Sequence, residues 1–366
     1  MNQKNAEGTE GLGAWGKMGV LALVLALSAG AVAAPKTGSG GDTSTSTSTS
    51  TSTSTTGKGY EHYIVGNAAD FTRSASPATQ AIVMMGGGID VDEAFAWMIQ
   101  KSGGGDFVVI RAAGTDAYNS YIYNMKGVDS VETLVIKTRE AANSTYVNER
   151  VQKAEVVFIA GGDQNDYIRL WKGTALDTTL KTLMEKKVPI GGTSAGLAVL
   201  GQFDYTGANG SITSAEALAN PYDKRMTLDM GFLTVPGLGG VITDSHFVTR
   251  DRMGRMLTFT ARLIKDKWVS QAAVRAVGVD SETALLVEDG IAKRVGKGSA
   301  YFMQPNTGAL VTCEAGKPLT FRNVAVDRLS GAGTYSLKDW ASFDSSVVRY
   351  DVSAEAGVLL PTGSPY

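Results

Sequence analysis

The sequence contains few of the residues that build disulfide frameworks and metal centres. Its 366 residues include a single cysteine, Cys313, and two histidines, His62 and His246. One cysteine cannot form an intramolecular disulfide. Without a CxxC pair or a cluster of cysteine and histidine, a zinc site of the usual kind is not expected either. The sequence therefore gives no indication of a zinc centre.

A clear excess of charge of one sign is also lacking. Charged residues make up 19% of the chain, and the formal net charge is −2. Proteins that bind nucleic acid usually carry a marked basic excess, so a nucleic-acid partner is not predicted. Apolar residues make up 43%, as in globular proteins, and the 44 glycines suit tight turns between strands and helices.

The strongest apolar stretch is too short to favour a membrane-spanning helix. It covers residues 18–32, is rich in Ala and Gly, and would have to cross about 30 Å of hydrocarbon. Lys17 precedes it, and Ala31, Val32 and Ala33 fit the small-x-small cleavage pattern of a secretory signal. We predict a signal peptide over residues 1–33 and a secreted or periplasmic protein without membrane contact after cleavage. The alternative is a membrane anchor.

A run of alternating Ser and Thr follows the apolar stretch, from Thr43 to Thr56. Such a segment cannot bury apolar surface, which is typical of a disordered spacer. We predict a linker over residues 34–59 and one large folded domain over residues 60–366.

Short apolar runs alternate with amphipathic stretches at the start of this domain. The runs end in small residues and cover residues 81–85, 107–111, 133–137, 155–160 and 188–190. Helix-like segments include residues 91–100 and 195–201. Uniformly apolar runs are typical of parallel strands that are buried on both faces. The pattern predicts an α/β fold with a mostly parallel sheet between layers of helices, and a short antiparallel extension from Ala284 onward.

One of these turns carries a candidate nucleophile. Gly192-Thr193-Ser194-Ala195-Gly196 matches G-x-S-x-G between a predicted strand and a predicted helix, where small neighbours allow a sharp turn that presents the serine hydroxyl. The alternative is a glycine-rich turn with an incidental serine. A serine that attacks a carbonyl also needs fixed donors for the oxyanion. The backbone amides of Ala195 and Gly162 are the candidates.

A serine hydroxyl needs a neighbouring base, which is most often histidine. His62 lies beside the Ser/Thr-rich tract and is interpreted as an incidental surface residue. His246 is then the candidate base. A carboxylate usually fixes the tautomer of such a histidine, and the sequence offers Asp244, Asp280 and Glu282 for this role.

Three arginines follow the candidate base, at positions 250, 252 and 255. They could form a solvated helix face, which is common for runs of charge. The alternative is a substrate site, because the guanidinium fork suits carboxylates. The sequence leaves both interpretations open.

Together, three segments carry a resemblance to a known family. GGDQ at residues 161–164, GGTSAG at residues 191–196 and DSHFVTRDRMGRML from Asp244 resemble the motifs of the cyanophycinases, which are serine peptidases. The resemblance runs from about Tyr60 to near the carboxyl end. It implies a fold like that of the class I glutamine amidotransferases, a homodimer, and an activity that uses neither a metal nor another cofactor. It also implies hydrolysis of cyanophycin, a polyaspartate with arginine on each side chain, to β-aspartyl-arginine dipeptides.

The resemblance assigns roles by position. Ser194 would be the nucleophile, His246 the base, and Gly162 and Ala195 the oxyanion donors. The residues that would line the substrate pocket are Gln164, Asp244, Arg250, Arg252 and Arg255.

One position departs from the family pattern. Where the family reads Gly-Ile-Asp-Glu, with Glu as the third triad member, this chain has Ser281, and Glu282 comes one residue later. We expect the loop to present Glu282 to His246, with Asp280 or a water molecule as alternatives.

Three other functions remain open at this point. The chain could be an α/β-hydrolase that cleaves esters, although no HGGG-type oxyanion motif is present. It could be an exported binding protein of the same fold without catalysis, or a peptidase limited to short aspartyl peptides.

Overall fold

The protein folds into two mixed β-sheets with helices packed against them. The computed structural model describes residues 52–71, 77–309, 311–342 and 344–366. The predicted signal peptide and most of the predicted linker lie outside the described residues. In the described part of the chain, no helix combines the length and the apolar character needed to cross a bilayer.

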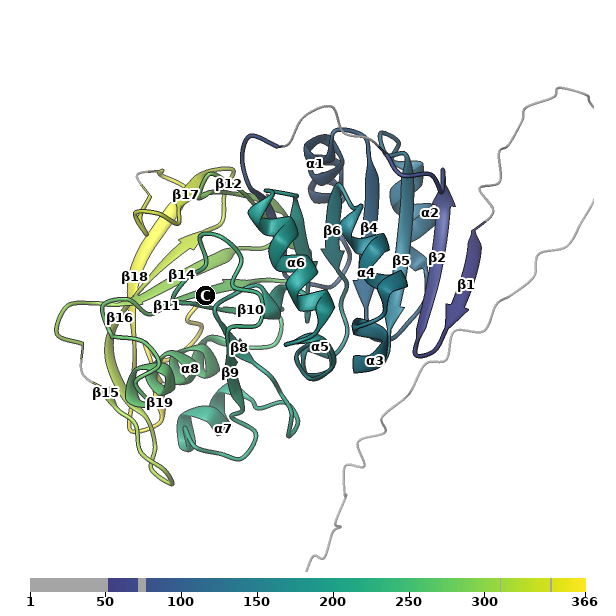
Figure 1. Cartoon of the computed structure of the whole chain (residues 1–366). Helices are drawn as coiled ribbons and strands as arrows, with labels where there is room; N and C mark the ends of the chain where they lie inside the picture. Colours follow the sequence, from purple (N-terminus) through teal and green to yellow (C-terminus); the bar gives the residue numbers. More distant parts are fainter. Residues whose placement is uncertain (1–51, 72–76, 310, 343) are drawn as a thin grey trace, which may run out of the picture. The chain divides into compact units, whose positions relative to one another are not determined.

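The first sheet has ten strands (Figure 1). Its five central strands run parallel to one another, and the strands added on either side are antiparallel. In order across the sheet, the strands are β1 (Thr53–Gly57), β2 (Tyr60–Gly66), β5 (Ser130–Ile136), β4 (Asp106–Arg111), β6 (Val156–Ile159), β7 (Ile190–Thr193), β3 (Ala81–Met85), β12 (Thr283–Glu288), β13 (Ile291–Gly296) and β17 (Thr334–Ser336).

The second sheet contains nine strands and is antiparallel except at β8, β10 and β11. Its main path runs through β19 (Val358–Leu360), β18 (Val347–Glu355), β16 (Thr320–Leu329), β14 (Ala300–Pro305), β11 (Arg275–Val279), β10 (Val241–Asp244), β8 (Phe203–Tyr205) and β9 (Leu228–Met230), and β15 (Val311–Thr312) pairs with β16.

Helices flank both sheets, as Figure 1 shows. The helical segments are α1 (Asp92–Ser102), α2 (Ala117–Asn124), α3 (Arg139–Ala142), α4 (Thr145–Gln152), α5 (Gln164–Trp171), α6 (Ala175–Glu185), the 3-10 turn η1 (Leu197–Val199), α7 (Ser214–Ala219) and α8 (Met253–Lys265). Helix α8 packs into the apolar core of the second sheet, which is separate from the two cores on the faces of the first.

The apolar strands of the first sheet are buried on both faces, as their composition predicts. In β3, Val83 and Met85 pack into the core that contains α1, whereas Ile82 and Met84 pack into the core that contains α6. Successive side chains of a strand point to opposite faces, so a continuous apolar run serves both cores.

The sheets are mixed, so the prediction of a mostly parallel sheet was not confirmed. The segment from Ala284 onward does pair in antiparallel fashion, as predicted, but it is not a short extension. Antiparallel strands make up the flanks of the first sheet and most of the second. The apolar runs identify only the buried central strands. Other strands pair with segments that are distant in the sequence, as β12 does with β3, and local composition does not indicate such pairing. The likeness to the glutamine amidotransferases stays a prediction.

The boundary of the predicted linker also needs correction. Residues 53–57 form β1, which pairs with β2 at the edge of the first sheet. The Ser and Thr side chains of β1 are mostly exposed, so an edge strand needs no apolar residues of its own there. Backbone hydrogen bonds to β2 hold it, and the folded part therefore begins before Tyr60.

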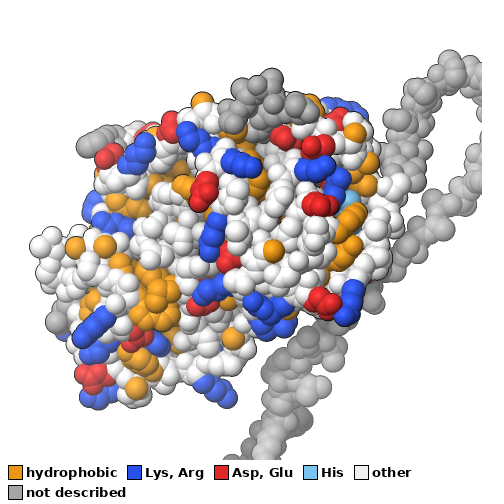
Figure 2. All heavy atoms as spheres, in the orientation of Figure 1, with side chains coloured by type: hydrophobic (Ala, Val, Ile, Leu, Met, Phe, Trp, Pro, Cys, Tyr) orange, Lys and Arg blue, Asp and Glu red, His pale blue; other side chains and the backbone are white. Residues whose placement is uncertain are grey.

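The face of the molecule in Figure 2 carries Lys and Arg side chains interspersed with Asp and Glu. This mixture is consistent with the near-zero net charge of the chain. No basic stripe of the kind that follows a phosphate backbone is visible on this face.

Candidate active site

The turn after β7 presents Ser194 in a strained conformation. Ser194 has φ of 53°, and its backbone N–H donates to the carbonyl of Met85 at 3.0 Å. A Cβ added to Gly192 would lie 2.4 Å from the carbonyl carbon of Gly196, and one added to Gly196 would lie 2.0 Å from the carbonyl oxygen of Ile159. The two glycines of the G-x-S-x-G motif are therefore needed because backbone segments approach closely here.

The helix predicted after this turn is much shorter than expected. Only Leu197–Val199 is helical, as one 3-10 turn, instead of residues 195–201. The chain then enters the short strand β8 almost at once.

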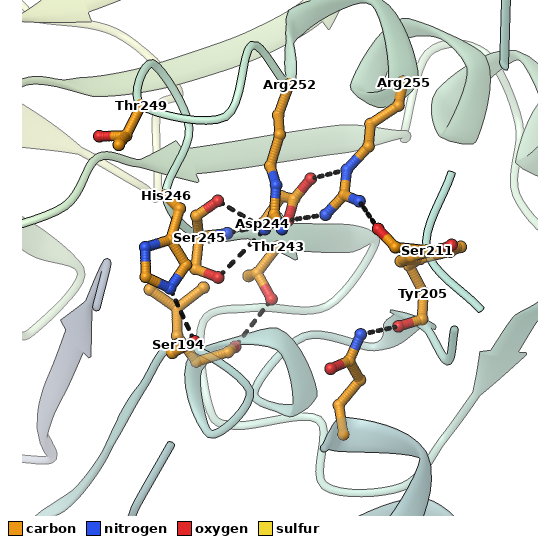
Figure 3. Close-up of polar contacts among 12 residues, drawn as sticks. Ser194, Tyr205, Ser211, Thr243, Asp244, Ser245, His246, Thr249, Arg252 and Arg255 are labelled. Carbon is orange, nitrogen blue, oxygen red and sulfur yellow. Dashed lines mark hydrogen bonds and ion pairs between the residues drawn. The ribbon is translucent and has the colours of Figure 1, made fainter. Parts of the chain in front are cut away.

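Ser194 and His246 come together although 52 positions separate them. The Ser194 Oγ lies 2.9 Å from Nε2 of His246 (Figure 3). Ser194 follows a strand of the first sheet, and His246 follows β10 of the second. The two sheets thus meet at this pair. A hydroxyl beside a ring nitrogen is the arrangement that a nucleophile and its general base require.

The glycine-rich loop after β3 holds His246 in place. The backbone N–H of His246, which has φ of 46°, donates to the carbonyl of Gly86 at 2.8 Å. Gly87 has φ of 90°, and a Cβ at that position would lie 2.4 Å from Cε1 of the imidazole. The sequence shows this loop as a cluster of glycines, but nothing in it indicated that the loop supports the candidate base.

The other ring nitrogen of His246 contacts Ser281 instead of the expected glutamate. Nδ1 lies 2.9 Å from the Ser281 Oγ. Glu282 forms a salt bridge with the exposed Lys297. The loop therefore does not shift to present Glu282, because Glu282 has φ of 55° and its N–H is fixed to the carbonyl of Gly87 at 2.7 Å. The expected Glu282–His246 contact is absent from the described residues.

Asp280 does not contact His246 either. Its Oδ1 accepts hydrogen bonds from the backbone of Val248 and Thr249, at 3.1 and 3.0 Å, and from the Thr249 hydroxyl at 2.9 Å. Asp280 therefore fixes the turn that follows His246.

Of the three arginines that follow His246, two are buried and one is exposed. Arg252 and Arg255 both bind Asp244, with shortest distances of 2.8 and 2.6 Å (Figure 3). Asp244 is 3% exposed. Burial alone would raise the pKa of its carboxyl group, but the two guanidinium groups outweigh this effect and hold the pKa below its usual value. Arg250 is exposed and forms no ion pair with the described residues.

A pocket of about 320 Å³ lies beside these arginines. Its lining residues are Gly162, Asp163, Gln164, Tyr205, Gly207, Gly210, Ser211, Arg250, Arg252 and Arg255. Five predicted site residues thus share one pocket, whereas Asp244 lies behind it, paired with arginine. Asp244 is thus not among the residues that line this pocket, contrary to the expectation, because its buried carboxylate binds two guanidinium groups. Sequence reasoning missed Tyr205 and Ser211, for which no motif gave a signal.

Two backbone amides near Ser194 are available as donors. Neither Gly162 N–H nor Ala195 N–H makes a hydrogen bond to another described residue. A Cβ on the neighbouring Gly161 would lie 3.6 Å from the Cβ of Ser194, so this loop passes close to the hydroxyl. The positions of these amides are compatible with the predicted oxyanion site, and their role stays a prediction.

Known proteins similar to this chain belong to the family that the sequence motifs resemble. The model of peptidase family S51 matches residues 82–219. The curated cyanophycinases of Trichormus variabilis and of a Nostoc species are each 30% identical over 226 residues, which cover 59% of this chain and 68% of each relative. The chain belongs to the cyanophycinase-like S51 peptidases. It is a serine-type peptidase.

A solved structure of a peptidase from an acI-B1 Actinobacterium also matches this S51 peptidase. It shares 16% sequence identity with a TM-score of 0.47, and the match covers 71% of this chain and 98% of that one. In the described part of the peptidase, no group of three or more His, Cys, Asp or Glu side chains is arranged to hold a metal ion.

The other histidine of the peptidase is not the surface residue that was expected. His62 is 4% exposed. Its Nε2 lies 2.9 Å from Glu132, and its Nδ1 lies 2.8 Å from the Tyr146 hydroxyl. His62 lies on β2, the second strand of the first sheet, beside α4, far from the pocket. With Glu132 and Tyr146 it forms a structural cluster.

His246 is surrounded by groups that keep it neutral. Burial, followed by the positive charges of Arg250 and Arg252, lowers its pKa to about 4, while Asp244 and Asp280 oppose this shift. The imidazole is therefore unprotonated at neutral pH, as a general base must be.

We expect NMR titration to show this lowered pKa directly. The chain has only two histidines, so labelled histidine gives two imidazole signals, and His62→Gln assigns them. The His246 signal should stay in its neutral position as the pH falls from 7 to 5 and should change near pH 4. A midpoint near the ordinary value of about 6.5 would contradict the described surroundings.

The close approach of Gly87 to the imidazole predicts that a methyl group at this position impairs activity more than it impairs stability. Gly87→Ala should displace His246 and reduce peptidase activity by at least about 100-fold, as misplacement of a catalytic group does. Gly103→Ala is the matched control, because Gly103 also has a positive φ of 72° but has no atom within 4 Å of the added Cβ. Gly103→Ala should lose about 1 kcal/mol of stability in denaturant unfolding and Gly87→Ala somewhat more, both should stay folded, and only Gly87→Ala should lose activity. Equal activity in the two variants would contradict the role of this contact.

Proposed function

We propose that the protein is an exported cyanophycinase that uses Ser194 as nucleophile and His246 as base. The observation that carries this proposal is the 2.9 Å contact between the Ser194 hydroxyl and Nε2 of a neutral, buried His246, beside an arginine-lined pocket. Family membership supports the reaction class, and the name of the curated relatives supports the substrate.

In the proposed reaction, Nε2 of His246 accepts the proton of the Ser194 hydroxyl as its oxygen attacks the scissile carbonyl. The amides of Gly162 and Ala195 donate hydrogen bonds to the oxyanion that develops. His246 then returns the proton to the leaving amine, which leaves an acyl-enzyme on Ser194. A water molecule, deprotonated by His246, hydrolyses this ester and frees the serine.

The charges of the pocket favour a substrate with carboxylates. Arg250 is the exposed cation of the pocket, and its guanidinium has no carboxylate partner in the described structure. Arg252 and Arg255 face the same pocket and keep positive charge there, although Asp244 offsets part of it. Because each aspartate side chain of cyanophycin is joined to an arginine, the free carboxylates of the polymer belong to these arginyl groups, and one of them would bind at Arg250. Gln164 lines the same pocket.

Export and dimerisation are further parts of this proposal. Export is supported by the apolar run at residues 18–32 and its cleavage pattern, and would place the enzyme where it meets external polymer. Formation of a homodimer is supported by the family resemblance. Release of β-aspartyl-arginine from chain ends is the proposed mode of attack.

Ser194→Ala and His246→Ala should each reduce the rate of cyanophycin hydrolysis by several orders of magnitude. The double variant should be no slower than either single variant, because the two residues act as a unit. The measurement is clearing of an insoluble cyanophycin suspension, with mass spectrometry of the released dipeptides. Ser270→Ala, at an exposed serine between α8 and β11, is the matched control and should keep full activity. Hydrolysis by purified Ser194→Ala would disprove the mechanism.

The arginines should respond differently to substitution. Arg250→Ala should raise KM about tenfold or more without changing stability, because it removes an exposed cation from the substrate site. Arg255→Ala should lower the free energy of unfolding by about 1–3 kcal/mol, because the buried Asp244 loses one of its two guanidinium partners and keeps Arg252. Steady-state kinetics and denaturant unfolding of both variants test this contrast. An unchanged KM in Arg250→Ala would remove that residue from the substrate site.

A further inference from the structure

We propose that Ser281 is the third member of the triad, a positioning residue whose hydroxyl accepts a hydrogen bond from Nδ1–H of His246. This contact keeps Nε2 free of a proton where it faces Ser194. The inference rests on the proposed function, because it takes Ser194 and His246 as nucleophile and base. It differs from the sequence expectation by making the third member an uncharged hydroxyl.

The two ring nitrogens of His246 determine what Ser281 must do. Each of them lies 2.9 Å from a serine hydroxyl, Ser194 at Nε2 and Ser281 at Nδ1. In a neutral imidazole one nitrogen carries the proton and the other accepts. Nε2 can remove a proton from Ser194 only if Nδ1 carries the hydrogen. In that tautomer, Ser281 is the acceptor.

The backbone on both sides of Ser281 is fixed against the segment that carries His246. The N–H of Glu282 donates to the carbonyl of Gly87 at 2.7 Å. On the other side, the Asp280 carboxylate accepts from the turn after His246 through Val248. A Cβ on Gly88 would lie 3.2 Å from the Cβ of Ser281, so the glycine loop leaves just enough room for this side chain. The Ser281 hydroxyl is therefore positioned by its surroundings.

The carboxylates near the imidazole have other partners. Asp244 binds Arg252 and Arg255, Asp280 binds the turn after His246, and Glu282 pairs with Lys297. None of the three carboxylates hydrogen-bonds to the His246 ring in the described structure. Ser281 is thus the side chain that contacts Nδ1.

A hydroxyl in this position has consequences that a carboxylate would not have. A carboxylate only accepts and carries a negative charge, whereas a hydroxyl is neutral and can donate or accept. Ser281 therefore orients the ring without compensating the positive charge that forms on it during proton transfer. The charged groups that face the ring are Arg250, Arg252, Asp244 and Asp280, and the Glu282–Lys297 pair lies on the same loop as Ser281. A carboxylate introduced at position 281 should strengthen the base.

The first test observes the imidazole itself in the full-length protein. Nitrogen-15 NMR of labelled histidine distinguishes a protonated from an unprotonated ring nitrogen, and His62 serves as the internal reference. The wild type should show hydrogen on Nδ1 of His246. Ser281→Ala should lose this preference, Ser281→Thr should retain it, and Ser281→Asp should retain it and raise the midpoint of the His246 titration. An unchanged tautomer in Ser281→Ala, or an unchanged midpoint in Ser281→Asp, would overturn the proposal.

The second test measures nucleophile activation without the polymer. A fluorophosphonate probe should label Ser194, and the labelling rate at pH 7 should fall on the order of tenfold in Ser281→Ala, as expected for loss of one orienting hydrogen bond. Ser281→Thr should restore the rate to within about twofold of the wild type, since it returns the hydroxyl. Equal rates in the wild type and Ser281→Ala would overturn the role of Ser281.

The same probe separates this inference from the proposed function. Absence of labelling in the wild type, or labelling that persists in His246→Ala, would refute the proposed nucleophile and base together with the role of Ser281. Labelling that depends on Ser281 in a protein that does not cleave cyanophycin would refute only the substrate and would support the triad.

Discussion

The close approach of backbone segments at the ends of β3, β6 and β7 is the constraint on which the active site depends. Gly192 and Gly196 allow the turn of Ser194 to pack against the end of β6, and Gly87 leaves room for the imidazole. A methyl group at any of these positions would overlap backbone or ring atoms. The hydroxyl and the imidazole can therefore meet at 2.9 Å only because side chains are missing around them.

This packing also maintains unfavourable backbone conformations. Ser194, His246 and Glu282 all have positive φ, which costs about 1–3 kcal/mol for a residue with a side chain. Each of the three is held by a hydrogen bond from its own N–H, to Met85, Gly86 and Gly87 respectively. One short segment of the first sheet and its loop thus fix Ser194, His246 and the loop of Ser281 together. These backbone hydrogen bonds to one segment explain how Ser194 and His246, which follow strands of different sheets, stay in contact.

Electrostatics around the site favour a neutral base and an anionic ligand at the same time. The arginines that give the pocket its positive charge also lower the pKa of His246. The buried Asp244 orients Arg252 and Arg255 and offsets part of their charge. A bound carboxylate at Arg250 would reduce the positive field on His246 and make it a stronger base. In the proposed function, substrate charge and base strength would thereby be coupled through the same guanidinium groups.

Local pattern determined several features of this protein. Residue types and spacing indicate the central apolar strands, the turn of Ser194 and the pairing of Ser194 with His246. Mixed sheet topology could not be predicted, because strands such as β12 pair with segments that lie far away in the sequence, in this case with β3. The start of the fold at β1 depends on backbone hydrogen bonds to β2, which side-chain composition does not indicate.

Within the site, the sequence by itself determined which groups can do chemistry, because a hydroxyl, an imidazole and guanidinium groups are properties of residue types. The tertiary structure decided their partners. It directed Asp244 to the arginines, Glu282 to Lys297 and Ser281 to the imidazole. A shift of one residue in the loop exchanges a carboxylate for a hydroxyl at Nδ1. That choice depends on the backbone bonds of Asp280 and Glu282 to segments more than thirty positions away, which no local pattern encodes.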